Sequence, residues 1–121
     1  MVLKLNVDDH IVEVDEGPYL MNWSATEDAI VFAEKLVAQL SEYKDVACEK
    51  LLTLYNETWL DDEIGLIDEQ RFKELLIDPC LTISDEIGAA TVYFKDSDMF
   101  GGHWVEISLD NFEVSHVGII G

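Results

Sequence analysis

Basic residues are scarce in this chain of 121 residues. Seven Lys and Arg residues stand against 26 Asp and Glu residues, so the formal net charge is −19 at pH 7. We do not expect direct binding to nucleic acid, because the chain has no cluster of cations to displace counterions from phosphates. So large a negative charge favours a basic protein partner, but it equally suits a highly soluble surface or a salt-adapted host.

Cysteines and long apolar runs are scarce as well. The only two cysteines, Cys48 and Cys80, lie far apart and form no Cys-x-x-Cys pair, so we expect two reduced, buried thiols. No apolar run has the length of a membrane span, and the first residues become polar too soon for a signal peptide. We therefore expect a cytoplasmic protein without a membrane partner.

The sequence patterns of common enzymes are missing. There is no Gly-x-Ser-x-Gly turn and no glycine-rich loop that opens a helix. His10, His103 and His116 are spread along the chain without the spacing of metal ligands. We therefore expect neither a metal, nor a cofactor, nor an enzymatic activity. Composition and pattern describe a very acidic domain but do not name its chemistry.

The apolar periodicity predicts strands, then helices, then strands again, in a single domain over residues 1–121. The expected helices are Ala25–Leu40 with a capping box from Ser24 to Glu27, Tyr43–Leu60, and a short helix capped by Asp68. The expected strands are Leu3–Val7, His10–Val14, Cys80–Ile83, Ala89–Lys95, His103–Leu109 and Glu113–Ile120, with Tyr19–Trp23 as a further strand or an ordered arm. This order predicts an α+β fold: an antiparallel sheet, made of an N-terminal hairpin and a C-terminal four-strand meander, with two to three helices packed on one face.

The stretch from Asp96 to His103 joins two of these strands and is unusual for a hairpin connection. Gly101 and Gly102 supply backbone freedom for the turn, but the turn also contains Met99 and Phe100, which a short polar loop does not need. Two interpretations stay open here. The apolar pair either folds back to cap the core or forms the rim of a binding site.

A second acidic cluster follows the second predicted helix. Asp61, Asp62 and Glu63 stand at its C-terminal end, where the helix dipole is unfavourable to anions. This is a weak sign of selection for something other than stability, although an exposed loop explains each residue as well. Within the same helix end, Asn56 predicts specific hydrogen bonds or fraying, and Trp59 is expected to anchor the core.

Several of these segments together resemble a bacterial domain family of unknown biochemical function. In that family a helix ends in Asn-x-x-Trp, and a later hairpin reads roughly Asp-x-Asp-(Leu/Met)-Phe-x-Gly-His. The resemblance covers about Leu51–Gly121. The residues that carry it here are Leu54–Leu60 with Asn56 and Trp59, Phe72, Leu75 and Leu76, Ser97–His103 with Gly102 and His103, and the terminal Ile120-Gly121. One departure is Gly101, whose position is commonly aromatic in the family.

The resemblance implies a role, because domains of this kind include immunity proteins of polymorphic toxin systems such as contact-dependent growth inhibition. Our leading hypothesis is therefore a non-enzymatic immunity protein that neutralises a cognate, basic nuclease toxin. Negative charge would imitate the nucleic acid backbone and speed association. The candidate partner-binding residues are Asp61, Asp62, Glu63, Asp96, Asp98 and Phe100, and the rival surface is formed by Glu42, Asp45 and Glu49.

Two other functions stay open. The first is a small enzyme or a ligand- or metal-binding domain with a pocket formed by Asn56, Trp59, Asp98 and His103, although Asn56 and His103 also suit a purely structural role on buried backbone groups. The second is an acidic adaptor that binds a basic protein without inhibiting it. The oligomeric state is open too, since the last strand suits a dimer edge as well as a sheet within one chain.

Overall fold

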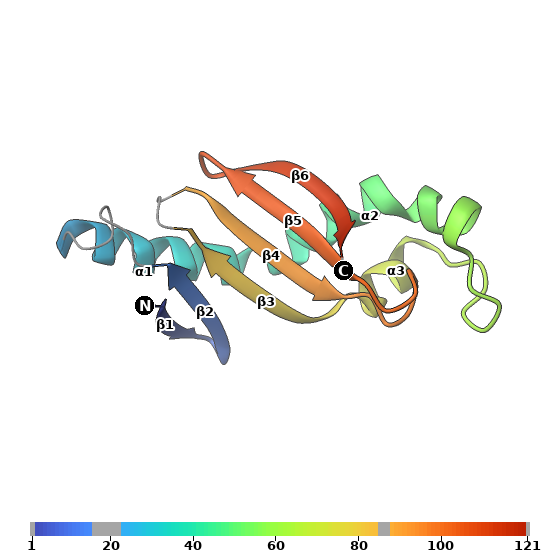
Figure 1. Cartoon of the computed structure of the whole chain (residues 1–121), viewed down its shortest axis with the longest axis horizontal. Coiled ribbons are helices and arrows are strands. Elements are labelled where there is room, and N and C mark those ends of the chain that lie inside the picture. The colour runs from blue at the N-terminus through green and yellow to red at the C-terminus, as the bar shows by residue number, and fades with distance from the viewer. Residues whose placement is uncertain (1, 16–22, 85–87, 121) are drawn as a thin grey trace.

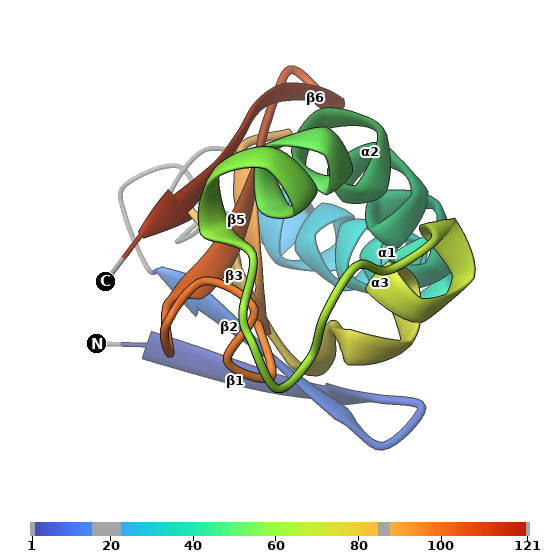
Figure 2. The same cartoon turned by 90° about the vertical axis from the view of Figure 1, so that its right-hand side faces the viewer.

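The computed structural model describes residues 2–15, 23–84 and 88–120. Within them, six strands form one sheet in the order β1-β2-β3-β4-β5-β6 (Figure 1). The strands are β1 (Val2–Val7), β2 (His10–Asp15), β3 (Ile77–Ile83), β4 (Ala90–Lys95), β5 (Trp104–Asp110) and β6 (Glu113–Ile120). The helices are α1 (Trp23–Ala38), α2 (Leu40–Leu54), the π-helix η1 (Tyr55–Trp59) and α3 (Glu69–Leu75). Figure 2 shows the helices on one side of the sheet, which confirms the predicted α+β architecture.

The N-terminal hairpin joins the C-terminal strands through a parallel pair of strands. Val12 of β2 lies opposite Leu81 of β3, and Val14 lies opposite Ile83. All other neighbouring strands are antiparallel. A parallel pair needs a long crossover, and the helical segment between β2 and β3 provides it. The sheet is thus mostly antiparallel, with one parallel joint that the sequence patterns do not predict.

Two hairpin turns use residues with positive φ. Asp8 and Asp9 turn the chain between β1 and β2 with φ values of 48° and 66°. Asn111 and Phe112 do the same between β5 and β6 with 53° and 67°. Two successive left-handed residues match the twist of the paired strands, and Asp and Asn tolerate this conformation better than most side chains.

Phe112 is bulky for a left-handed position, but it is held from several sides. Its amide donates to the Gly88 carbonyl at 2.8 Å. Its ring meets the ring of Phe32 edge-on at 5.1 Å between centroids, and Lys35 Nζ lies 5.9 Å from the same centroid. These contacts tie the β5–β6 turn to α1 and offset the cost of the backbone conformation.

The helices begin and end a few residues away from the predicted bounds. α1 ends at Ala38, not at Leu40, and α2 begins at Leu40, not at Tyr43. Only Gln39 separates them, and helical hydrogen bonding continues across it, because the Gln39 amide donates to Lys35 and the Tyr43 amide donates to Gln39. The predicted cap at Ser24 lies outside the described side chains, and the predicted arm at 19–23 lies outside the described residues as far as residue 22.

The short helix α3 begins as predicted and ends at Leu75, and the strand that follows it contains a bulge. Asp68 is its N-cap, with its carboxylate accepting the Arg71 amide at 2.8 Å. β3 then starts at Ile77, earlier than the predicted Cys80. Asp78 has a φ of 49°, and the pairing with β4 shifts register between Ile77 and Cys80. Pro79 is tolerated at this place because a bulge does not need its missing amide.

The core lies between the helices and one face of the sheet, and no described helix lies over the opposite face, which we call the helix-free face (Figure 2). The predicted stripe of α1 is buried, including Phe32, Ala33 and Leu36. Cys48 is buried as expected, but the expectation for Cys80 is wrong. Cys80 is exposed because it sits just after the bulge on the helix-free face. No described helix combines the length and the apolarity that a membrane crossing requires.

Candidate functional site

One end of the molecule brings together the motif segments of the sequence. There η1, the loop that follows it (residues 60–67) and the β4–β5 turn (residues 96–103) lie side by side (Figures 1 and 2). Ring contacts join them, since Trp59 lies 5.7 Å from Phe100 and 5.8 Å from His103 between centroids. We call these three segments the acidic end. Its carboxylates are those of Glu57, Asp61, Asp62, Glu63, Asp96 and Asp98.

The β4–β5 turn is organised by the buried carboxylate of Asp96. Its Oδ1 accepts the Asp98 amide at 2.9 Å, and its Oδ2 accepts the amides of Phe100 at 2.9 Å and His103 at 3.0 Å. Asp96 is only 3% exposed. Both oxygens are therefore engaged inside the protein, and the proposed contact of Asp96 with a partner is not supported. Asp98 is exposed and keeps its place as a candidate.

The apolar residues of this turn cap the core. Phe100 is fully buried, and Met99 is buried beside it. The Phe100 ring lies within a shell of aromatic rings, 5.9 Å from Tyr55, 5.7 Å from Trp59 and 6.4 Å from Phe72 between centroids. Of the two interpretations of this pair, the core cap is confirmed. The expectation of an exposed Phe100 at a binding rim is wrong, because the turn folds back onto η1 and α3.

Two side chains of η1 hold the loop of residues 60–67 in place through hydrogen bonds to its backbone. Asn56 makes hydrogen bonds with the backbone carbonyl and the backbone amide of Ile67. Its Nδ2 donates to the carbonyl oxygen at 3.1 Å, and its Oδ1 accepts from the amide at 3.2 Å. The Tyr55 hydroxyl donates to the Gly65 carbonyl at 2.9 Å and accepts the Asp61 amide at 3.3 Å. The specific hydrogen bonds predicted for Asn56 are confirmed. A π-helical turn widens the helix here, a feature frequent at functional sites.

Asp61 braces the loop from within. Its Oδ1 accepts the amides of Glu63 at 2.8 Å and Ile64 at 3.1 Å, and its carbonyl accepts the Gly65 amide at 2.7 Å. Among the three acidic residues of this loop, Asp61 thus has an internal role. Asp62 and Glu63 project from the loop as exposed side chains.

The outer surface of the acidic end combines these charges with apolar area. Trp59 is 38% exposed, Leu60 is 47% exposed and Leu66 is 75% exposed. Trp59 therefore lies at the margin of the core and not within it as expected. Leu60 and Leu66 are missing from the sequence-based candidates. The sequence did contain a sign of them, because an exposed acidic loop does not need two leucines.

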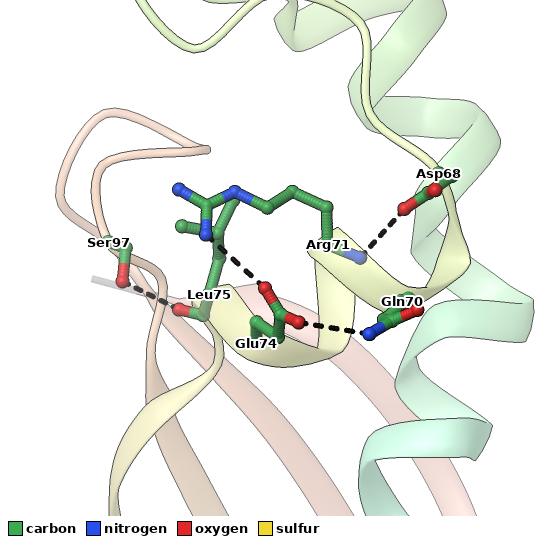
Figure 3. A network of polar contacts seen from close by, with 6 residues as sticks. All are labelled: Asp68, Gln70, Arg71, Glu74, Leu75 and Ser97. Carbon is green, nitrogen blue, oxygen red and sulfur yellow. Dashed lines mark hydrogen bonds and ion pairs between the residues drawn. The ribbon is translucent and has the colours of Figure 1, made fainter.

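A polar network fixes α3 against the turn (Figure 3). The Ser97 hydroxyl donates to the Leu75 carbonyl at 2.7 Å and joins the turn to the end of α3. On the outer face of α3, Glu74 accepts from Arg71 at 3.4 Å and from Gln70 at 3.2 Å. The turn is therefore held by α3 on one side and by η1 on the other.

The negative charge of the acidic end has little internal compensation. Within the described ranges, three ion pairs occur, namely Arg71–Glu74, Lys73–Asp45 and Lys95–Asp78. None of them includes a carboxylate of the acidic end. In the described part of the chain, the carboxylates of Asp62, Glu63 and Asp98 therefore have no ion-pair partner.

The alternative pocket is only partly assembled. Asp98 and His103 line a shallow hollow of about 220 Å³ together with Lys95 and Trp104, but Asn56 and Trp59 do not reach it. His103 Nδ1 is hydrogen-bonded to the Phe100 carbonyl, and Asn56 is committed to Ile67. The structural interpretation of Asn56 and His103 is thus supported by their hydrogen bonds.

The other candidate metal ligands, the buried thiol and the rival acidic surface offer weaker sites. In the part of the chain that the structure describes, no three His, Cys, Asp or Glu side chains gather as metal ligands. Burial raises the pKa of the Cys48 thiol, which also donates to the Glu69 carbonyl at a sulfur–oxygen distance of 3.8 Å. The rival acidic surface on α2 has one of its carboxylates, Asp45, paired with Lys73 at 2.9 Å. The acidic end is therefore the strongest candidate site.

A comparison with known protein families finds a match that covers the motif-bearing segments. The sequence profile of a family described as "Uncharacterized protein conserved in bacteria (DUF2262)" matches residues 19–118. No curated protein and no solved structure matches the chain. The match spans α1 to β6 and includes the whole acidic end. The chain therefore belongs to this conserved bacterial family.

Proposed function

We propose that this protein is a cytoplasmic immunity protein that binds and neutralises a cognate, basic nuclease toxin through its acidic end. The observation that carries the proposal is a braced loop that presents uncompensated carboxylates around exposed Trp and Leu side chains. The resemblance to immunity proteins supports the same role. The partner is a protein, because a surface of this charge repels nucleic acid.

Charge supports the proposal through selectivity and speed. A nuclease needs a positive cleft to hold the phosphate backbone, and the exposed carboxylates of Asp62, Glu63 and Asp98 offer charge of the opposite sign. Complementary charge raises association rates to as much as 10⁸–10⁹ M⁻¹s⁻¹ at low salt, against about 10⁵–10⁶ M⁻¹s⁻¹ for neutral surfaces. Fast binding is what a protein needs when the toxin is already in the same compartment.

Apolar anchors and rigidity supply the affinity. Trp is enriched among the residues that dominate interfaces, and Trp59 stands exposed between Leu60 and the β4–β5 turn. The clamps from Tyr55 and Asn56 hold the loop in one conformation before binding. A preorganised surface loses less conformational entropy in the complex, so more of the contact energy appears as affinity.

The test uses the basic C-terminal fragment of any large reading frame that lies immediately upstream of this gene, which we call the toxin domain. Binding is measured at low and high salt, and nuclease activity is followed across the same titration. We expect nanomolar affinity, one-to-one inhibition and an association rate that falls with salt. Binding without inhibition would point to an adaptor instead, and no binding would refute the proposal.

Reversing the charge of single acidic clusters tests which surface of the protein binds the toxin. Asp62→Lys combined with Glu63→Lys should weaken binding by about 10- to 100-fold, mainly through slower association. The matched control is Glu27→Lys combined with Asp28→Lys, which changes the net charge equally on exposed residues near the start of α1, at the opposite end of the molecule (Figure 1). Equal losses in both variants would mean that total charge matters and the acidic end does not.

A further inference from the structure

The outer edge of β6 has no partner strand among the described residues. β6 is the last strand of the sheet, and no described strand pairs with its outer side. Edge strands of natural sheets are usually short or contain Lys, Pro or a bulge, which prevents unwanted pairing. β6 is eight residues long, contains neither Lys nor Pro, and has Glu113 as its one charged residue apart from His116. A register shift near Ser108 and Leu109 leaves a regular run from His116 to Ile120.

Apolar side chains on both faces of β6 are incompletely covered. Val114 and Ile120 are each 37% exposed, and Val117 and Ile119 are half-buried. Ile120 also borders a shallow apolar hollow of about 260 Å³ on the helix-free face, lined by Cys80, Tyr93 and Trp104. An additional strand would cover these side chains on both sides of the sheet.

The free edge leads directly to the acidic end. Ile120 lies opposite Trp104 in the β5–β6 ladder. Trp104 follows His103, whose ring contacts Trp59 at 5.8 Å between centroids. A segment that runs along β6 therefore arrives beside the loop of residues 60–67. The two surfaces form one path from the part of β6 without Asp, Glu, Lys or Arg, residues 116–120, to the negative loop.

From these features we infer that an extended segment of the toxin domain adds to β6 as a seventh strand of the sheet. This inference rests on the proposed function. The segment carries apolar side chains along Val117–Ile120 and Lys or Arg at the end that meets Asp62 and Glu63. Main-chain hydrogen bonds hold the segment, and the hollow beside Trp104 selects its side chains.

Charge favours this occupant over a second copy of the chain. Antiparallel pairing of two β6 edges relates the copies by a two-fold axis perpendicular to the sheet, which leaves the helices of both copies on the same side. α2 packs beside β6 and exposes Glu42, Asp45 and Glu49. Two chains of charge −19 would thus meet along their acidic helices, whereas a cationic segment is attracted to the same edge.

The first experiment is hydrogen–deuterium exchange of the full chain, alone and with the toxin domain. In an antiparallel ladder the amides of successive residues point alternately to the two neighbours. In the free protein only the β6 amides that face β5 should be slow. In the complex the alternate amides of residues 116–120 should become slow too. The outer amides of β1, the opposite edge, should stay unchanged and serve as the internal control.

A pair of proline variants tests the ladder directly. His116→Pro and Val117→Pro remove neighbouring amides, of which one faces β5 and the other faces the free edge. The variant that keeps the wild-type melting temperature is the one that blocks the outer edge. That variant should bind the toxin about 2- to 12-fold more weakly, since it loses one ladder hydrogen bond worth about 0.5–1.5 kcal/mol.

The outcomes separate the inference from the proposed function. Protection of β6 and weaker binding by the edge variant support the inference. Inhibition by the wild type, with no new protection and full affinity of the edge variant, overturns the inference and leaves the proposed function standing. If the wild type neither binds nor inhibits the toxin, both fail. Protection of β6 without toxin, together with a dimer in sedimentation, would assign the edge to a second copy and overturn the inference.

Discussion

Removing the Asp96 carboxylate should be the most damaging single change in the β4–β5 turn. Three amides, those of Asp98, Phe100 and His103, donate to it at 2.9 to 3.0 Å. Asp96→Ala leaves all three without their acceptor, and the hydrogen bond from the Phe100 amide is buried. The turn then loses the group that fixes it over the core.

The magnitude follows from the number and type of these bonds. A hydrogen bond to a charged group contributes about 1.5–3 kcal/mol, but bonds that share one carboxylate are not additive. We expect Asp96→Ala to lower the free energy of unfolding by about 3–5 kcal/mol. The stability of ordinary domains is only about 5–15 kcal/mol, so the melting temperature should fall by more than about 10 °C. Asp96→Asn keeps one acceptor oxygen and should cost about half as much.

Urea unfolding followed by tryptophan fluorescence measures the effect, with the slope checked for two-state behaviour. Asp98→Asn is the matched control because it removes the same charge from the same turn, at an exposed side chain. It should change the free energy of unfolding by less than about 0.5 kcal/mol. Wild-type stability of Asp96→Ala, or an equal loss in Asp98→Asn, would refute the role assigned to the buried carboxylate.

Three further predictions concern other parts of the chain. Asn56→Ala removes both hydrogen bonds to Ile67 and should cost about 1–3 kcal/mol in urea unfolding, with faster amide exchange in the following loop; unchanged exchange would contradict the clamp. Cys80 should react at once with a thiol reagent, whereas Cys48 should react only on unfolding, since burial raises its thiol pKa; Cys80→Ser should abolish the fast phase and nothing else. Burial raises the pKa of Tyr43 to about 12 from 10.0, so the unfolded chain loses this proton first and stability should fall as pH rises from 10 to 12. Tyr43→Phe should remove that part of the decline in the urea midpoint, and an identical decline would show that another group causes it.

Element types were largely predictable from the sequence because they depend on local features. Alternation marked both strands of the N-terminal hairpin, and Asp8-Asp9 marked its turn. Asp68 was predictable as an N-cap from its own chemistry and the apolar spacing around it. Helix ends were less predictable, since Gln39 interrupts the helical register without interrupting the hydrogen bonding, and no Gly or Pro marks the break.

The candidate site was predictable in location but not in the roles of its residues. Asp62, Glu63 and Asp98 are exposed as a charged surface requires. Asp96 and Phe100 belong to the same motif but point inward, because the turn folds back onto η1. Sequence spacing does not distinguish a carboxylate that meets solvent from one that accepts three backbone amides, since the difference arises from contacts with residues far away in the chain.

By itself, the sequence determined the net charge, the strand and helix periodicity, the turn residues and hence the α+β class. These properties reside in single residues or in neighbours a few positions apart. The tertiary structure alone decided the parallel joint of β2 and β3, the burial of Phe100, the exposure of Cys80 and Trp59, and the free edge of β6. Each of these depends on which distant segments pack together, because burial and strand pairing are properties of contacts and not of positions in the chain.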